Sequence, residues 1–371
     1  MKLLPLTFLS LSLLQAAAQE HYMLVGTYDS PKSDGIYVYR FNSTDGKVKE
    51  SGHVKTPNPS FIAVSPDGKY VYAVHETAPQ DGKGGDVAAF AFNKKTGTLT
   101  FLNRQLSGGD HPCHVEVDKT GQWVFVSNYS NGTLSVLPVA GGGSLGTATV
   151  IRHEGSGKHP QRQKGPHVHG AIISDDNRQL FVTDLGIDKL MIYSFDAGTG
   201  QLIPAREPYI EAEPGSGPRL FTFHPLKKFA YVIEELSGTV VTYRYKRGRL
   251  KARQRISTMP AGDTLPPNSA DVHVSPDGRF LYASNRGDVN TIAIYRINKN
   301  GTLRLTGHQS ALGKTPRNFS IDPTGRFLLC ENQNSDEIVI FKRNEQTGLL
   351  SDSGNRIKVG KPVCIKWISV N

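Results

Sequence analysis

Residues Gly215 to Thr239 read GSGPRLFTFHPLKKFAYVIEELSGT and contain the clearest structural unit of the chain. Its pattern predicts a β-hairpin, with strands at residues 221–223 and 229–233 joined by a turn that contains a proline. Arg219 and Glu235 lie equally far from the centre of that turn, so the hairpin returns both to the same end. A cation and a carboxylate brought together in this way are either a structural ion pair or part of a site.

The hairpin is one copy of a unit that recurs along the chain, with a period of about fifty residues. Each unit has an apolar strand, a turn of the Pro-Asp-Gly kind, a second strand that ends in a polar loop, and a third strand. The turn and second strand recur at residues 65–72, 118–125, 174–181, 224–231, 275–282 and 322–329. The third strand follows at residues 86–92, 133–139, 189–195, 239–245, 291–297 and 337–341. A fourth strand often follows a Gly-Thr-Leu or Gly-Leu-Leu turn.

The two ends of the chain complement each other. Residues 22–50 supply only the later strands of a seventh copy, and residues 361–367 resemble its missing first strand. A repeat of four strands that closes into a ring predicts an all-β fold, a seven-bladed β-propeller with one blade closed by both chain termini. No helical pattern of useful length follows residue 18. Residues 19–371 are therefore expected to form one domain.

Residues 1–18 have the pattern of a signal peptide. Lys2 supplies the positive start, residues 3–14 are apolar, and the three alanines at 16–18 offer a small-residue cleavage site. The apolar stretch is too short to span a bilayer comfortably. We therefore expect an exported protein, periplasmic or secreted, with no stable membrane insertion after cleavage.

Charge and cysteine content narrow the function classes. The formal net charge is +10, but no run of Lys and Arg is long enough for a nucleic-acid tail, and the densest basic cluster, residues 246–255, falls in a predicted hairpin. The positive charge is either a solvated face or a guide for an anionic substrate. Three cysteines allow no complete disulfide framework and are predicted to be buried small side chains. No CxxC or HExxH spacing supports a metal site.

Aligning the repeats places two sets of residues at one face of the ring, near the central channel. The position of Arg219 is occupied in successive blades by Ser60, Cys113, His169, Arg219, Ala270, Arg317 and Val363. The position of Glu235 is occupied by Tyr28, Glu76, Tyr129, Leu185, Glu235, Arg286 and Gln333. A channel mouth with convergent charged groups is the default binding site.

Four of these residues, from three successive blades, form the predicted catalytic set: His169, Arg219, Glu235 and Arg286. A single Arg–Glu pair is often structural, and His169 alone could be a strand histidine with an ordinary partner. Four such groups in adjacent blades favour a site. Weaker candidates for substrate binding are His167, Arg317, Glu76 and His114.

The same residues carry a resemblance to a known family. The motifs are Pro166-His167-Val168-His169, Gly217-Pro218-Arg219, Glu235-Leu236, Ser284-Asn285-Arg286-Gly287 and Pro316-Arg317-Asn318-Phe319. With them, nearly all of the chain after residue 18 resembles the 6-phosphogluconolactonase / carboxy-muconate lactonizing-enzyme family of seven-bladed propellers. The resemblance implies that the family's active His, Glu and two Arg fall on His169, Glu235, Arg219 and Arg286. The chain departs from the family at Leu220, where a histidine is common.

The leading hypothesis is hydrolysis of a small anionic or sugar lactone, as in 6-phosphogluconolactonase. Arg219 and Arg286 would bind a phosphate or carboxylate and stabilise the oxyanion. Glu235 or His169 would take the proton of the attacking water. The reaction needs neither a cofactor nor a metal. The alternatives are a muconate-type cycloisomerase and a non-enzymatic exported binding propeller. The sequence leaves open the physiological lactone, its phosphorylation and the oligomeric state.

Overall fold

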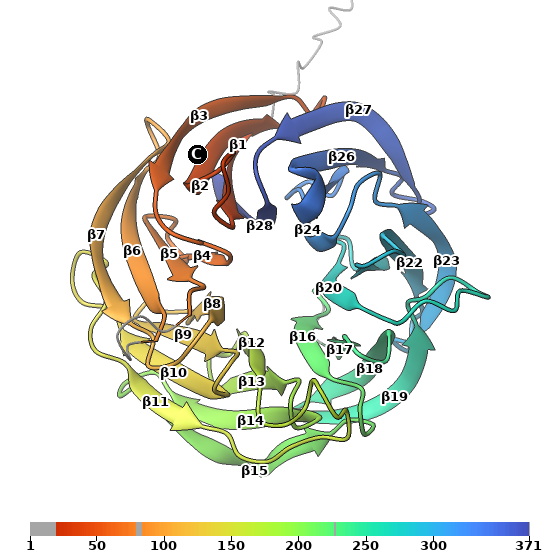
Figure 1. Cartoon of the computed structure of the whole chain (residues 1–371), viewed down its shortest axis with the longest axis horizontal. Helices are drawn as coiled ribbons and strands as arrows, with labels where there is room; N and C mark the ends of the chain where they lie inside the picture. Colours follow the sequence, from red (N-terminus) through yellow and green to blue (C-terminus); the bar gives the residue numbers. More distant parts are fainter. Residues whose placement is uncertain (1–19, 79–83, 226–227, 371) are drawn as a thin grey trace, which may run out of the picture.

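The fold is a ring of seven antiparallel sheets around a central axis (Figure 1). The computed structural model describes residues 20–78, 84–225 and 228–370. Every sheet in these ranges has four strands, so the prediction of a seven-bladed β-propeller is confirmed. The predicted signal peptide, residues 1–18, and the turn residues Leu226 and Lys227 lie outside the described residues.

In every blade the strands pair in order from the centre of the ring to its edge (Figure 1). Blade 1 contains β28 (Pro362–Ser369), β1 (Glu20–Thr27), β2 (Gly35–Asn42) and β3 (Val48–Lys55). Blade 2 contains β4 (Ile62–Val64), β5 (Tyr70–His75), β6 (Asp86–Asn93) and β7 (Thr98–Leu106). Blade 3 contains β8 (Pro112–Val117), β9 (Trp123–Asn128), β10 (Thr133–Pro138) and β11 (Thr149–Arg152). Blade 4 contains β12 (Val168–Ile173), β13 (Gln179–Asp184), β14 (Lys189–Asp196) and β15 (Gln201–Glu211).

The remaining blades follow the same order. Blade 5 contains β16 (Pro218–Phe223), β17 (Phe229–Glu234), β18 (Thr239–Lys246) and β19 (Arg249–Ser257). Blade 6 contains β20 (Ser269–Val274), β21 (Phe280–Asn285), β22 (Thr291–Ile297) and β23 (Leu303–Ser310). Blade 7 contains β24 (Pro316–Ile321), β25 (Phe327–Asn332), β26 (Glu337–Arg343) and β27 (Leu350–Lys358). A short 3₁₀ turn, η1 (Gln333–Ser335), follows β25.

Both ends of the described chain lie in blade 1. The C-terminal strand β28 pairs antiparallel with β1, from His21 opposite Ser369 to Thr27 opposite Pro362. The blue and red ribbons are therefore neighbours in Figure 1. This pairing confirms the predicted closure of the ring by the two chain ends.

The hairpin of blade 5 is longer than its sequence pattern indicated. The pattern placed the first strand at residues 221–223, but β16 begins at Pro218, which pairs with Glu234. The register shifts by one residue between Pro218 and Leu220, so Arg219 is the extra residue of a β-bulge. A bulge interrupts the alternation of buried and exposed residues, which is why the pattern seemed to start later.

The hydrophobic core lies between neighbouring blades. One cluster, for example, joins Tyr231 and Ile233 of blade 5 to Val272 and Leu281 of blade 6. The inner strands read as nearly continuous apolar runs because both of their faces are covered. All three cysteines are buried and free, as predicted. Within the described residues, no helix is long and apolar enough to cross a membrane.

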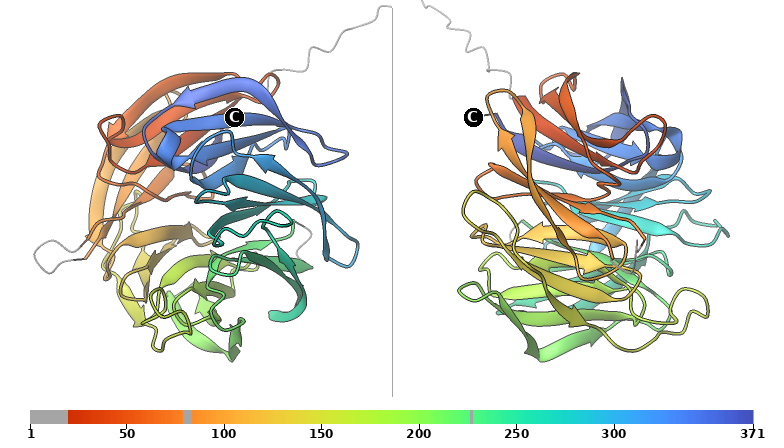
Figure 2. Two further views of the ribbon diagram at one scale, coloured as in Figure 1. Left: turned by 45° about the vertical axis from the view of Figure 1, so that its right-hand side comes forward. Right: turned by 60° about the vertical axis from the view of Figure 1, so that its left-hand side comes forward.

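The same contact between a turn glycine and a side chain occurs between each blade and the preceding one. The turn between the third and fourth strands carries a glycine with positive φ, and a Cβ there would collide with a side chain at or near the start of the second strand of the preceding blade. The pairs are Gly46–Phe327, Gly97–Tyr22, Gly143–Tyr70, Gly200–Trp123, Gly248–Gln179, Gly301–Phe229 and Gly348–Phe280. Six of the seven partners are aromatic. The turn glycines found in the sequence therefore serve the contact between blades as well as the turn itself. Figure 2 shows the ring in two turned views, with loops projecting at its faces.

Substitution of Gly348 by alanine tests this contact. The residue has φ near +78°, and its new Cβ would lie 2.3 Å from Phe280 Cδ1. The left-handed backbone costs about 1 kcal/mol, and displacing the buried ring costs about 1–3 kcal/mol more. We expect the midpoint of urea unfolding to fall accordingly.

Gly354→Ala is the matched control. Gly354 has nearly the same φ, +80°, but a Cβ there meets nothing within 4 Å. It should lose only the backbone contribution of about 1 kcal/mol. Equal losses for the two variants would show that the contact with Phe280 contributes nothing.

Candidate active site

A ring of bulged residues points toward the central channel. The register shift seen at Arg219 recurs at the start of the innermost strand in blades 1, 3, 4, 6 and 7. The extra residues are Val363, Cys113, His169, Arg219, Arg317 and one of the pair Ala270–Asp271. A bulge re-aims one side chain without ending the sheet. The positions predicted by repeat alignment are therefore the bulged ones. In blade 2, where β4 begins later, Ser60 precedes the strand and lines one small cavity together with the bulged residues of other blades.

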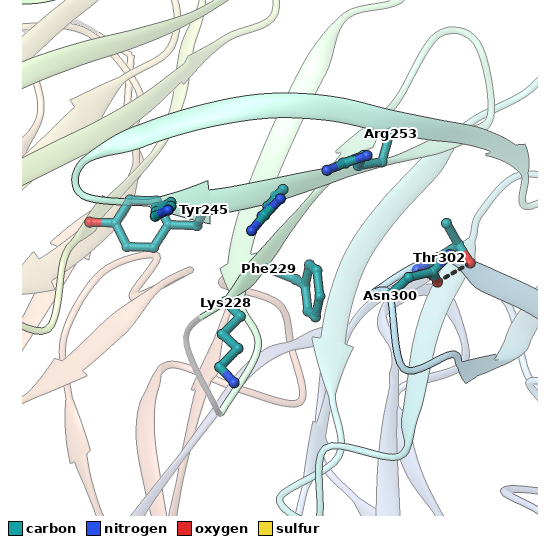
Figure 3. Close-up of a pocket in the computed structure, with 8 residues that line it drawn as sticks. Lys228, Phe229, Tyr245, Arg253, Asn300 and Thr302 are labelled. Carbon is teal, nitrogen blue, oxygen red and sulfur yellow. Dashed lines mark hydrogen bonds between the residues drawn. The ribbon is translucent and has the colours of Figure 1, made fainter.

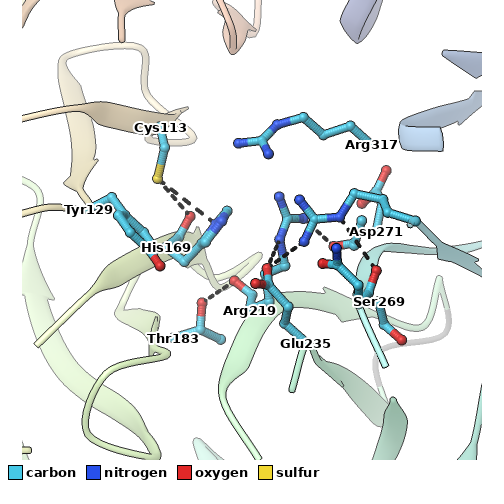
Figure 4. A network of polar contacts seen from close by, with 12 residues as sticks. Cys113, Tyr129, His169, Thr183, Arg219, Glu235, Ser269, Asp271 and Arg317 are labelled. Atoms are coloured by element: carbon cyan, nitrogen blue, oxygen red, sulfur yellow. Dashed lines mark hydrogen bonds and ion pairs between the residues drawn. The ribbon is translucent and has the colours of Figure 1, made fainter. Parts of the chain in front are cut away.

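Glu235 is the centre of the polar network in Figure 4. It follows β17 in the loop to the third strand, and its side chain is only 4% exposed. Arg219 Nε donates to Glu235 Oε2 at 2.9 Å and Arg286 Nη2 donates to the same oxygen at 2.7 Å. Arg162 Nη2 donates to Oε1 at 2.6 Å. Three guanidinium groups thus surround one buried carboxylate.

These charges determine the ionisation of Glu235. Burial alone would raise the pKa of its carboxyl group, but the charges of Arg286, Arg219 and Arg162 outweigh burial and hold the pKa well below its ordinary value. Glu235 is therefore ionised throughout the neutral range. A carboxylate of such low basicity, bound by three cations, is a better anchor for arginines than an acceptor of protons.

The arginines are themselves crowded. Burial, and then the charge of Arg317, lowers the pKa of Arg219. Burial also lowers the pKa of Arg286, and Arg219 and Arg317 add to that effect. A guanidinium nevertheless keeps its proton near neutral pH. The repulsion among these groups is relieved when an anion binds between them.

Arg317 belongs to a second cluster on the opposite side of the mouth. Its Nη2 lies 3.8 Å from Glu76 Oε1, and its guanidinium lies 5.5 Å from the centre of the Tyr28 ring. Tyr28 Oη and Ser60 Oγ donate to Glu76 Oε2 at 2.7 and 2.5 Å. The ion pairs of the mouth join four guanidiniums to two carboxylates. A third carboxylate, Asp271, also acts on Arg219, so guanidiniums exceed carboxylates by one.

His169 lies beside Cys113 and Tyr129 (Figure 4). Its Nδ1 is 3.9 Å from Cys113 Sγ, and no partner for its Nε2 occurs among the described residues. Burial, followed by the charge of Arg219, lowers the pKa of His169 well below its ordinary value, so the imidazole is neutral at pH 7. Burial raises the pKa of the Cys113 thiol, which therefore stays protonated.

Tyr129 joins both histidines of the motif at residues 166–169. The His167 ring stacks on Tyr129 with centroids 4.4 Å apart, and the His169 ring meets it edge-on at 5.6 Å. His167 Nδ1 also lies 2.8 Å from the Tyr129 carbonyl oxygen. His167 thus helps to fix the Tyr129 ring, which in turn packs against His169.

His114 lies apart from the other predicted residues. It is one position beyond the bulged Cys113, packs against Phe61 with ring centroids 4.3 Å apart, and lines a cavity of about 250 Å³ that reaches the turn residues Lys119 and Asp175. The mouth residues Cys113, His169, Arg219 and Arg317 instead line a separate space of about 10 Å³. That volume corresponds to roughly one water molecule. Burial lowers the pKa of His114 to about 3.

Arg162 was missed by the sequence reasoning. It belongs to the connection between blades 3 and 4, residues 153–167, which has no strand and is longer than the other connections between the described blades. Repeat alignment therefore could not assign it a position. Within the described residues, no group of three or more His, Cys, Asp or Glu side chains could hold a metal ion.

A larger cavity, of about 610 Å³, lies away from the mouth at the hairpin between β18 and β19 (Figure 3). Its walls include Lys228, Phe229, Arg244, Tyr245, Lys246, Arg253, Asn300 and Thr302. It contains part of the basic cluster that the sequence placed in a hairpin. None of the predicted site residues lines it, so the candidate site is the channel mouth.

Comparisons with known proteins point in the same direction. A family model described as "Lactonase, 7-bladed beta-propeller" matches residues 22–367. A 6-phosphogluconolactonase of Formosa agariphila is 40% identical over 305 residues, which cover 81% of this chain and 86% of that protein. A 6-phosphogluconolactonase of Bacillus subtilis is 36% identical over 80% of this chain and 83% of that protein. The structure of a periplasmic gluconolactonase of Pseudomonas aeruginosa superposes with a TM-score of 0.90 at 35% identity, covering 95% of this chain and all of that one.

Substitution of Glu235 by glutamine tests the role of the central carboxylate. Three guanidiniums would lose their counter-charge in a buried site, so we expect a loss of about 3–5 kcal/mol of unfolding free energy at pH 7. The control is Glu207→Gln, which removes an exposed pair with Arg249. That change should cost less than about 1 kcal/mol.

The same pair of proteins gives a pH dependence. The pKa of Glu235 is depressed in the folded protein, so its contribution is complete above the unfolded value, near 4.5, and falls as the pH drops below it. The stability gap between wild type and Glu235→Gln should therefore narrow between pH 5 and pH 3 in urea unfolding. A gap that widens toward low pH would contradict this account.

Proposed function

The chain belongs to the lactonase family of seven-bladed β-propellers and is a lactone hydrolase, and we propose that it opens a sugar lactone at the mouth formed by His169, Arg219, Glu235 and Arg286. One observation carries the assignment to this mouth. Buried Arg219 and Arg286 are fixed by a single carboxylate in a site with excess positive charge. Such a site favours groups that become negative during the reaction.

The proposed reaction is the attack of water on the lactone carbonyl carbon. A bond forms between the water oxygen and that carbon, and the carbonyl oxygen becomes an oxyanion. Arg219 and Arg286 stabilise this charge with donors held in place before the substrate arrives. The oxyanion then re-forms the carbonyl, the bond to the ring oxygen breaks, and that oxygen receives a proton. The product is an open-chain acid, which releases a proton to the solution.

His169 is the proposed general base. Its imidazole is neutral, and within the described residues its Nε2 has no hydrogen-bond partner, so it can accept the proton of the attacking water. The charge of Glu235 partly offsets that of Arg219 and so reduces the cost of forming the imidazolium. Glu235 itself is engaged by three arginines, so its proposed role is to orient them.

No covalent intermediate is part of the proposal. Cys113 is the nearest thiol to His169, but burial raises the pKa of that thiol and keeps it in the unreactive protonated form. Attack by water in a space of roughly one water molecule beside His169 fits the geometry better.

We also propose that the protein is exported. Residues 1–18 have the pattern of a signal peptide, and the similar gluconolactonase of Pseudomonas aeruginosa is periplasmic. The propeller, residues 19–371, would then act as one domain on an aldonolactone outside the cytoplasm. In that setting the enzyme serves carbohydrate metabolism rather than a nucleic-acid or membrane partner.

A panel of aldonolactones, with and without a phosphate group, tests the activity. Acid release at constant pH should exceed the spontaneous rate for at least one of them. The variant His169→Gln should lower kcat about 10²- to 10⁴-fold, because it removes the base. His53→Gln, on the outer strand of blade 1, is the control and should leave kcat unchanged. Wild-type rates equal to the spontaneous rate for every lactone would refute the function.

The pH dependence of kcat/KM tests the identity of the base. A base acts in its deprotonated form, which exists above its pKa, and the pKa of His169 is lowered from 6.5. Enzymatic hydrolysis, corrected for the spontaneous rate, should therefore remain level as the pH falls through 6.5 and decline only below it. A decline centred at or above pH 6.5 would remove His169 from this role.

A further inference from the structure

Arg162 differs from the other arginines of the mouth in its origin and its exposure. Arg219 is held by a β-bulge and Arg286 follows β21, whereas Arg162 lies in the strandless connection at residues 153–167. Its side chain is 39% exposed, compared with 3% for Arg219 and 9% for Arg286. Arg162 therefore lies at the rim, above the two buried arginines and in contact with the same carboxylate.

The loop holds Arg162 firmly through its neighbour Gln163. The Gln163 side chain is buried, and its Nε2 donates to the Leu185 carbonyl at 2.7 Å and to Asp188 Oδ1 at 2.6 Å. Asp188 in turn accepts hydrogen bonds from the backbone N–H groups of Gly215 and Gly217. Gly217 leads directly into the strand that carries Arg219. The rim arginine and a buried arginine are thus positioned by one chain of hydrogen bonds.

The Arg162 guanidinium has donors to spare. Its Nη2 donates to Glu235 Oε1 at 2.6 Å and to Tyr129 Oη at 3.1 Å. In the described part of the chain, its Nε and Nη1 have no side-chain or backbone acceptor. A guanidinium is a planar fork suited to bidentate binding of phosphate or carboxylate. Nη2 belongs to both bidentate edges of that fork and is already engaged, so Arg162 offers an anion single N–H contacts from Nη1 and Nε on its partly exposed side chain.

A purely structural role does not account for this arrangement. Glu235 already has two buried cationic partners, and a third that is partly exposed adds little stability. It does add a positive charge to a mouth whose ion pairs already join more guanidiniums than carboxylates. The repulsion among these guanidinium groups is relieved when a negatively charged substrate binds between them.

We propose that Arg162 binds a second anionic group of the substrate, remote from the lactone carbonyl, and thereby makes the enzyme prefer anionic over neutral sugar lactones. The inference rests on the proposed function of the mouth. Because Arg162 and Arg219 contact the two oxygens of one carboxylate, a single small substrate can reach both. The anionic group can be a phosphate ester or a carboxylate, since the oxygens of both accept charge-assisted hydrogen bonds from guanidinium N–H groups.

The test compares three lactones: 6-phosphogluconolactone, glucarolactone with its free carboxylate, and neutral gluconolactone. In Arg162→Gln, kcat/KM for the preferred anionic lactone should fall about 10- to 100-fold, mainly through KM, because a charge-assisted contact is lost. For neutral gluconolactone it should change less than about threefold. Arg162→Lys should restore part of the loss, since a point charge replaces the fork. The anionic lactone whose kcat/KM falls most in Arg162→Gln identifies the bound group as phosphate or carboxylate.

Lys164→Gln is the matched control. Lys164 is an exposed cation of the same loop with no ion-pair partner in the described residues, so its removal changes the net charge equally. The ratio of kcat/KM for anionic and neutral lactones should stay unchanged in this variant. The same drop in ratio for Lys164→Gln would mean that long-range charge, rather than the Arg162 contact, sets the preference.

Two further outcomes would overturn the inference. Equal losses of kcat/KM for anionic and neutral lactones in Arg162→Gln would mean that Arg162 only positions Glu235. A wild-type enzyme with no preference for the anionic lactones would also overturn it, while leaving lactone hydrolysis intact. Failure of wild type on all three lactones would instead refute the proposed function of the mouth.

Discussion

The buried carboxylate of Glu235 is the interaction on which the functional end of the molecule depends. It brings together arginines from two blades and from one long loop, so it joins parts of the chain that the repeat keeps separate. Buried cations of like charge would otherwise repel each other and swing toward solvent. The cost is a site with a net positive field in a setting of low polarity. That field is what makes the mouth suitable for developing negative charge.

The ring itself is built from short, local rules. Apolar faces of neighbouring blades pack together, turn glycines receive aromatic rings from the preceding blade, and the last strand pairs with the first. Each rule acts between adjacent blades, so the mouth is a property of the closed ring rather than of any blade. The site requires this closure, because His169, Arg219 and Arg286 come from three different blades.

Much of this could be predicted from the sequence because it is periodic. The recurring turns and strands defined the seven blades, and aligning them placed His169, Arg219 and Arg317 in one ring although they lie far apart in the chain. Two features escaped the repeat pattern for different reasons. Arg162 comes from the connection at residues 153–167, which is longer than the other connections between described blades, so the alignment gave it no position. The start of β16 was hidden by a bulge, which shifts the alternation of buried and exposed residues by one position.

The bulges have a consequence for how such a protein can diverge. An extra residue in a strand has no partner opposite it, so its side chain can change in size and charge while the sheet keeps its register. Around this ring the same position already holds a thiol, an imidazole, two guanidiniums and an isopropyl group. Blade by blade, the chemistry of the channel can therefore be rewritten by single substitutions without refolding the scaffold. Related propellers can in this way diverge to hydrolyse, form or bind different cyclic substrates while they keep the same scaffold.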